Sequence, residues 1–187
     1  RMENEDLSIF DYVFCWLGNT NLILSIIKLI EDKMNLEHDI EEAGVQMILL
    51  VEDSIRFYSS ILPNLYNYIL EQSKNFSKEA LNRHAATMRM RGRPKVVLAR
   101  TYEEAQKLYD KYSNNTLGVI SDARFPLKSA AKAFGNDVDP SLKPKHRTDT
   151  FGREKCPDAG LQLFRYIRQH DPFVPLILES SESDNRA

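Results

Sequence analysis

Two adjacent carboxylates, Glu52 and Asp53, directly follow the apolar stretch at residues 47–51. An apolar run that stops at acids is typical of a buried parallel strand, which delivers polar side chains to the carboxyl edge of an α/β sheet. Adjacent carboxylates repel each other unless water or a cation neutralises them, and Mg²⁺ prefers oxygen ligands. The pair therefore indicates either a cation site or a solvated polar loop.

Two further strand ends carry polar side chains. The apolar stretch at residues 117–121 ends at Asp122, and Ser180 follows the last apolar stretch of the chain. In a doubly wound sheet the first and third of these strands are neighbours, so their carboxyl ends flank the same crevice. This arrangement would bring the three acids into one pocket. Three carboxylates could bind one Mg²⁺ and leave positions open for water and a phosphoryl group.

The elements that would position these side chains alternate along residues 45–187, which we predict to be one α/β domain with a parallel sheet and helices on both faces. We expect strands at residues 47–51, 96–99, 117–121 and 174–178, and helices at residues 102–112 and 160–170. Another helix should begin after Ser54, a good N-cap residue, and continue to about Met90.

Residues 1–44 are expected to form a strand–helix extension and linker ahead of that domain. Aromatic and β-branched residues at 12–17 predict a short buried strand, and an acidic linker should occupy residues 37–44. This unit could end a preceding domain, or it could cover the open edge of the sheet in place of a missing strand. The helix between strand and linker should turn these side chains inward: Leu22, Ile23, Ile26, Ile27, Leu29, Ile30 and Met34.

Composition excludes several classes of protein. The 187 residues are 42% hydrophobic and 28% charged, with a net charge of −2, which favours neither nucleic acid nor a membrane surface as a partner. No apolar run approaches the roughly 18–20 residues that span a bilayer. Cys15 and Cys156 are far apart and predict free thiols in a reducing compartment. Without a signal peptide, we expect a cytoplasmic protein.

The chain resembles the receiver domains of response regulators at four places, in the order and on the elements that this family requires. The resemblance covers residues 47–181 and implies a flavodoxin-like doubly wound sheet. It is carried by ILLVED at 48–53, ISDARFP at 120–126, DAGLQLFRYIR at 158–168 and VPLILESS at 174–181.

Roles for the polar residues follow from this resemblance. Asp122 would be the phosphoacceptor, a carboxylate nucleophile in a two-component phosphorelay. Glu52, Asp53 and Asp122 would hold Mg²⁺ together with the backbone carbonyl of Arg124. Ser180 would be the switch hydroxyl, unless it is an ordinary serine at a strand end. The implied partners are a sensor histidine kinase or another phosphodonor, downstream domains of the same chain, and a second copy in a homodimer.

Three departures from the family pattern are evident. The chain stops before the fifth strand, whose lysine pairs with the phosphate in receivers, and the first helix is extended. A long insertion, residues 127–157, follows the third strand of the receiver. We expect a solvated loop there, or a segment that contacts a phosphorylated partner or shields the site. Its basic residues are Lys128, Lys132, Lys143, Lys145, His146, Arg147, Arg153 and Lys155.

A second resemblance concerns the surrounding protein. VEDSIRFYSSILPNLY at 51–66 and RPKVVLARTYEEA at 93–105 are similar to the amino-terminal regulatory region of large bacterial proteins with a phosphoenolpyruvate synthase-like or pyruvate, phosphate dikinase-like part. The chain itself contains neither a phosphohistidine motif nor a nucleotide-binding glycine loop. We therefore expect self-phosphorylation rather than enzymatic turnover from this chain.

Three other functions are alternatives to a phosphoaccepting receiver. A degenerate receiver would act as an interaction module without taking up phosphate. A phosphohydrolase of the haloacid dehalogenase type needs Asp-x-Asp after its first strand, which residues 52–54 do not offer. RGRP at 91–94 resembles the minor-groove core of an AT-hook, but it is also consistent with a solvated helix end before a strand.

Overall fold

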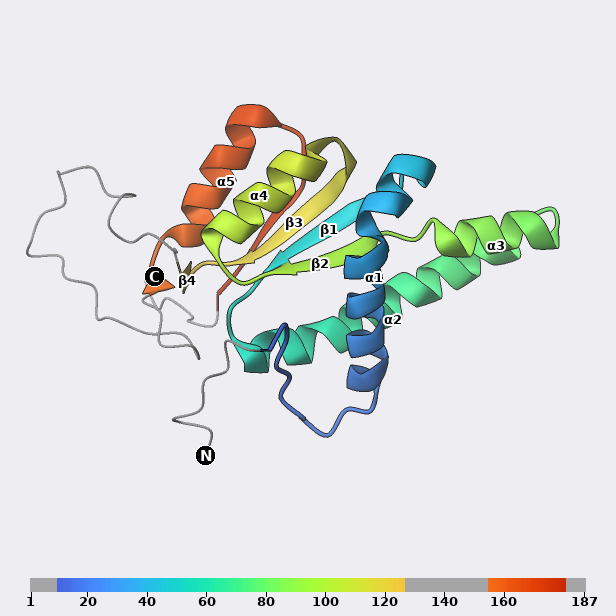
Figure 1. Cartoon of the computed structure of the whole chain (residues 1–187), viewed down its shortest axis with the longest axis horizontal. Helices are drawn as coiled ribbons and strands as arrows, with labels where there is room; N and C mark the ends of the chain where they lie inside the picture. Colours follow the sequence, from blue (N-terminus) through green and yellow to red (C-terminus); the bar gives the residue numbers. More distant parts are fainter. Residues whose placement is uncertain (1–9, 127–154, 181–187) are drawn as a thin grey trace, which may run out of the picture.

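The computed structural model describes residues 10–126 and 155–180, in which the chain forms a parallel sheet of four strands flanked by helices on both faces (Figure 1). The strand order is β2-β1-β3-β6, and all three neighbouring pairs are parallel. This confirms the predicted α/β class. The strands of this sheet are β1 (Met47–Val51), β2 (Lys95–Ala99), β3 (Thr116–Asp122) and β6 (Leu176–Glu179).

Helices connect these strands, and a small antiparallel ladder follows β3. The ladder pairs β4 (Phe125–Pro126) with β5 (Lys155–Cys156). The pairing of β4 with β5 therefore joins the two ends of the predicted insertion. Residues 127–154 lie outside the described part of the chain. The helices are α1 (Asn21–Ala43), α2 (Ile55–Lys78), α3 (Arg83–Arg91), α4 (Tyr102–Tyr112) and α5 (Ala159–His170), with a 3-10 turn at Ser113–Asn115.

The central strand β1 is buried on both faces, as its continuous apolar sequence predicts. Leu49 packs in a cluster with residues of α4 and α5, such as Tyr109 and Leu163. Leu50 faces the other way and packs with Tyr58 and further residues of α2. These two cores pack against opposite faces of β1, the strand that Glu52 and Asp53 directly follow. In contrast, β6 is an exposed edge of the sheet.

The prediction of a buried strand at residues 12–17 is wrong. These residues run as an irregular segment along α2, and their backbone bonds to side chains of that helix rather than to a strand. The Tyr58 hydroxyl donates to the carbonyl of Val13, and the Cys15 N–H donates to Ser59 Oγ at 2.9 Å. Phe14 adds an edge-to-face contact with Tyr58. Aromatic residues thus cover α2 instead of extending the sheet.

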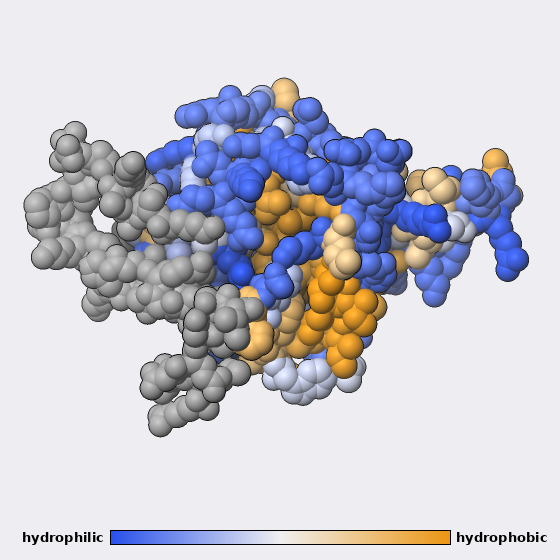
Figure 2. Space-filling view, viewed as in Figure 1, coloured by the Kyte–Doolittle hydropathy of each residue, from blue (hydrophilic) through white to orange (hydrophobic). Residues whose placement is uncertain are grey.

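Helix α1 departs from its prediction in length and in orientation. It continues through the expected linker and ends at Gly44, whose φ of 60° gives the left-handed cap typical of helix ends. Four of the apolar residues predicted to face inward are exposed and form part of an apolar surface around α1 (Figure 2): Ile23, Ile27, Ile30 and Met34. The prediction is confirmed for Leu22 and Leu29, which are buried, and the buried face also contains Leu36, Ser25 and Asp32.

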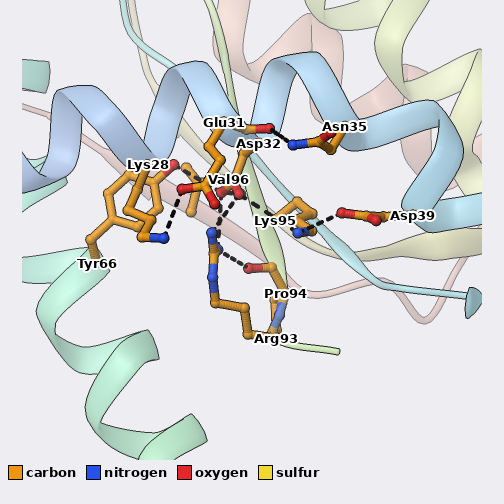
Figure 3. Close-up of polar contacts among 10 residues, drawn as sticks. All are labelled: Lys28, Glu31, Asp32, Asn35, Asp39, Tyr66, Arg93, Pro94, Lys95 and Val96. Atoms are coloured by element: carbon orange, nitrogen blue, oxygen red, sulfur yellow. Dashed lines mark hydrogen bonds and ion pairs between the residues drawn. The ribbon is translucent and has the colours of Figure 1, made fainter. Parts of the chain in front are cut away.

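Asp32 attaches α1 to the edge of the sheet (Figure 3). Its Oδ1 lies 2.6 Å from Arg93 Nη2, and its Oδ2 accepts hydrogen bonds of 3.0 Å from the Val96 N–H and the Tyr66 hydroxyl. Since Val96 belongs to β2, α1 covers that edge, and sheet edges are commonly protected in this way. A fifth receiver strand would follow β6, at the opposite end of the strand order. Helix α1 therefore does not take its place.

The long helical region after β1 is two helices rather than one. Helix α2 is continuous through Pro63 and ends at Lys78, and α3 packs back against it as a pair that projects beyond the sheet (Figure 1). Gly92 ends α3, but Arg93 of the RGRP stretch is only 6% exposed and pairs with Asp32. The expectation that this helix end is solvated is therefore wrong for Arg93. None of the described helices has the length and apolarity required to cross a membrane.

Candidate functional site

The carboxyl ends of β1 and β3 bring three predicted site residues together. Glu52, Asp53 and Asp122 each offer one carboxylate oxygen, and these oxygens all lie within 4.8 Å of one another. The register explains this proximity, because Val51 pairs with Ser121 in neighbouring parallel strands and the acids follow directly. The acids therefore converge as the strand-end pattern predicts.

Glu52 and Asp53 are deeply buried, with exposures of 4% and 0%. Glu52 Oε1 accepts a hydrogen bond of 2.9 Å from the N–H of Ser54, the residue that precedes α2. The Ser54 side chain itself makes no capping hydrogen bond, so the Glu52 carboxylate satisfies a backbone group at this helix start. Burial raises the pKa of Glu52 to about 8; the Ser54 N–H opposes this shift, and the charges of Asp122 and Asp53 add to it.

Asp122 is half-buried at the end of β3. Its Oδ1 accepts a hydrogen bond of 2.7 Å from the N–H of Ala123. Burial raises the pKa of Asp122, while the Ala123 N–H and the positive charge of Lys155 act in the opposite direction. Asp122 is thus less shielded from solvent than the other two acids.

A cleft of about 350 Å³ opens above this cluster and gives access to it. Asp122 and Glu52 line the cleft together with Phe57 of α2 and with Glu179 and Ser180 at the end of β6. The structure therefore places the predicted switch residue Ser180 in the same cleft as the predicted acceptor. Phe57, which the sequence did not single out, forms an apolar part of the wall.

Lys155 supplies a positive charge to the cluster. Its Nζ lies 2.9 Å from Asp53 Oδ1 and 2.7 Å from Asp53 Oδ2. The residue belongs to β5, which pairs with β4 just after Asp122. Its only signal in the sequence was membership of a run of basic residues, and nothing in that run distinguished Lys155 from its neighbours. Part of the predicted insertion thus contacts the site directly.

The donor set fits a hard divalent cation such as Mg²⁺. Three carboxylates offer oxygen ligands at close range, and like charges buried together require neutralisation. Glu52, Asp53 and Asp122 would hold the ion, and the carbonyl of Arg124 stays a predicted ligand. When bound, Mg²⁺ would neutralise negative charge on a phosphoryl group in the cleft.

No protein-family model, curated protein or solved structure matches this chain. The function proposed below is therefore supported by the sequence and by the geometry of this cleft.

Proposed function

We propose that this chain is a phosphoacceptor receiver domain with a flavodoxin-like fold, which accepts a phosphoryl group on Asp122 in a Mg²⁺-dependent reaction. The observation that carries the proposal is the position of Asp122, which is half-buried in an open cleft beside two buried acids. The strand order β2-β1-β3-β6 supports it, because it corresponds to the first four strands of the doubly wound order 2-1-3-4-5.

The proposed reaction uses the carboxylate of Asp122 as the nucleophile. A carboxylate oxygen attacks the phosphorus atom of the donor, and the bond between phosphorus and the leaving group breaks. The leaving group departs with the electron pair of that bond, and an aspartyl phosphate remains on the protein. A sensor histidine kinase or a small acyl phosphate would serve as the donor.

The output of the domain would be a conformational switch that regulates a larger cytoplasmic protein, with a phosphoenolpyruvate synthase-like part as one candidate target. Ser180 supports a switch because it directly follows β6 and lines the cleft that contains Asp122. A hydroxyl in this position could turn toward a new phosphoryl group and change the exposed surface of β6.

Mass spectrometry of the intact protein tests this proposal. After incubation with acetyl phosphate and Mg²⁺, the chain should gain one phosphoryl group, and the gain should disappear on addition of a chelator. The variant Asp122→Asn should gain none, whereas Glu179→Gln, which changes another acid of the same cleft, should react like the unmodified chain.

A second candidate function is that of an interaction module that takes up no phosphate. The salt bridge between Lys155 and Asp53 favours it, because one acid of the cluster is already neutralised without a metal ion. Absence of an adduct on the unmodified chain, under conditions in which Mg²⁺ binds, would support this second function.

A further inference from the structure

We infer that Lys155 is a phosphoryl-binding residue of this cleft, delivered by the segment inserted after β3. The inference rests on the function proposed above and assigns a role in it to a residue that belongs to no predicted site. Its basis is the contact between the Lys155 ammonium and both oxygens of Asp53, at 2.9 and 2.7 Å.

The position of Lys155 is set by a short ladder next to Asp122. β4 begins at Phe125, shortly after Asp122, and Phe125 pairs with Cys156 of β5. Phe125 is fully buried and Cys156 is 6% exposed, so both strands of the ladder are anchored in the core. The backbone that carries Lys155 is thereby held close to the proposed acceptor.

The Lys155 side chain is less buried than its partner. Asp53 is fully inaccessible, whereas the Lys155 side chain is 18% exposed. The positive charge also acts beyond its direct partner, because it partly opposes the rise that burial produces in the pKa of Glu52 and of Asp122. A cation in this position would attract an anionic group that enters the cleft.

The charges of the cluster favour such a role. The three carboxylates, when ionised, would be neutralised by one divalent cation together with one ammonium group. A phosphoryl group then brings further negative charge, which requires hydrogen-bond donors. The ammonium has three N–H donors. Within the described residues it donates one hydrogen bond, to Asp53 Oδ1, and forms an ion pair with Asp53 Oδ2, so a further donor could reach a phosphoryl oxygen. Lysine also has a long flexible side chain, which allows its ammonium to follow the incoming group.

A purely structural salt bridge is the alternative explanation. Burying an ion pair costs desolvation energy, and such pairs often add little net stability. A structural role would make Lys155 important for folding but not for the reaction rate of the folded protein. Stability, metal affinity and reaction rate must therefore be measured separately.

The test compares Lys155→Met and Lys155→Arg with the control Lys74→Met, which changes an exposed lysine of α2. We expect Lys155→Met to lower the rate of adduct formation with acetyl phosphate roughly 10²-fold, as loss of one charge-stabilising donor does in enzymes. Lys155→Arg should recover part of the rate because it keeps the charge. Lys74→Met should react at the rate of the unmodified chain.

Mg²⁺ affinity, measured by calorimetry without a phosphodonor, provides the second readout. Lys155→Met should bind Mg²⁺ as tightly as the unmodified chain or more tightly, because the ammonium no longer competes for Asp53. A loss of Mg²⁺ affinity that matches the loss of rate would show a structural role and overturn the inference. If Lys155→Met unfolds, the rate of adduct formation in the charge-preserving variant Lys155→Arg tests the inference in its place. A partly retained rate would support the inference, and a rate as low as that of Asp122→Asn would overturn it.

The outcomes also separate this inference from the proposed function. If the unmodified chain forms the adduct and Lys155→Met forms it equally fast, Lys155 has no role in phosphoryl binding, while the proposed function stands. If the unmodified chain forms no adduct, the proposed function fails and the inference fails with it.

Discussion

Gly160 lies directly against the backbone of Asp122. A Cβ atom at Gly160 would stand 2.4 Å from the carbonyl oxygen of Asp122 and 2.9 Å from Leu178 Cδ1. The Gly160 N–H also donates a hydrogen bond of 3.1 Å to the carbonyl of Ala123. The first turn of α5 is therefore packed against the end of β3, at the residue that carries the proposed acceptor.

We predict that Gly160→Ala destabilises the protein and impairs the site. Overpacking of this kind costs roughly 1–3 kcal/mol, because backbone must move to accommodate the methyl group. The displaced backbone would carry Asp122 with it, so adduct formation should slow at temperatures where the variant is still folded. Urea denaturation and intact-mass kinetics measure the two effects.

Gly92→Ala is the matched control for this substitution. A Cβ atom at Gly92 would stand 3.4 Å from its nearest neighbour, the carbonyl oxygen of Met88, at an ordinary φ of −75°. We expect a change within about 0.5 kcal/mol. If Gly160→Ala were equally mild, the close contact with Asp122 would not constrain the site.

Asp32 should be a principal determinant of stability, although it lies far from the cleft. Its carboxylate is fully buried and accepts hydrogen bonds from Arg93, Tyr66 and the backbone of Val96. Asp32→Asn leaves the buried Arg93 charge without its partner, which typically costs about 3–5 kcal/mol. Thermal or urea denaturation measures the loss.

An exposed acid one residue earlier in α1 gives the control for Asp32. Glu31 pairs with Lys28 at the surface, at 2.7 Å. Glu31→Gln should change stability by at most about 1 kcal/mol, as expected for exposed ion pairs. Equal effects of the two substitutions would contradict the anchoring role of Asp32.

Local patterns in the sequence predicted much of the sheet and one helix closely. β1 was recognisable because both of its faces are buried, which produces a continuous apolar run. The bounds of α4 matched because local residues define its start: Thr101 accepts a hydrogen bond of 3.3 Å from the Glu104 N–H. Such features depend on neighbours in the sequence.

Features that depend on distant partners were not predictable in the same way. Apolar residues occur around most of α1, so periodicity could not identify the buried face. The burial of Asp32 depends on distant partners, among them Arg93, 61 residues away. In the cleft, the acids followed from the rule on strand ends. Lys155 did not, because its position depends on the pairing of β4 with β5 across the insertion.

Ser180→Ala should separate phosphorylation from its structural consequence. Ser180 lines the cleft but is neither the proposed acceptor nor one of the proposed metal ligands, so the yield of adduct should change little. The response of β6 to phosphorylation should be lost, because a methyl group cannot bond to a phosphoryl oxygen. Hydrogen exchange of the β6 amides, with and without acetyl phosphate, measures this response.

A serine on the surface of α2 provides the comparison for that experiment. Ser60 is exposed and its hydroxyl donates to the carbonyl of Phe57 in its own helix, so Ser60→Ala should preserve both the adduct and the response of β6. An unchanged response in Ser180→Ala would rule out the switch role and leave Ser180 an ordinary strand-end serine.

The pKa of Glu52 predicts how stability depends on pH in the absence of metal. Burial raises this pKa to about 8, whereas a glutamate in an unfolded chain has a pKa of about 4.3. The folded state therefore holds the proton more tightly, and the stabilisation from protonated Glu52 is lost as the pH rises through 8. We expect a loss on the order of 2 kcal/mol between about pH 6 and pH 9. Denaturation in a chelating buffer measures it.

Mg²⁺ binding should show the opposite trend, because the ion requires ionised carboxylates and displaces the proton of Glu52. Affinity should rise with pH up to about 8, the pKa of Glu52, and then level off. Glu52→Gln should weaken binding and remove both pH effects, whereas Glu179→Gln in the same cleft should keep them. If Mg²⁺ affinity were independent of pH between about 6 and 9, or unchanged in Glu52→Gln, Glu52 would not be a ligand of the ion.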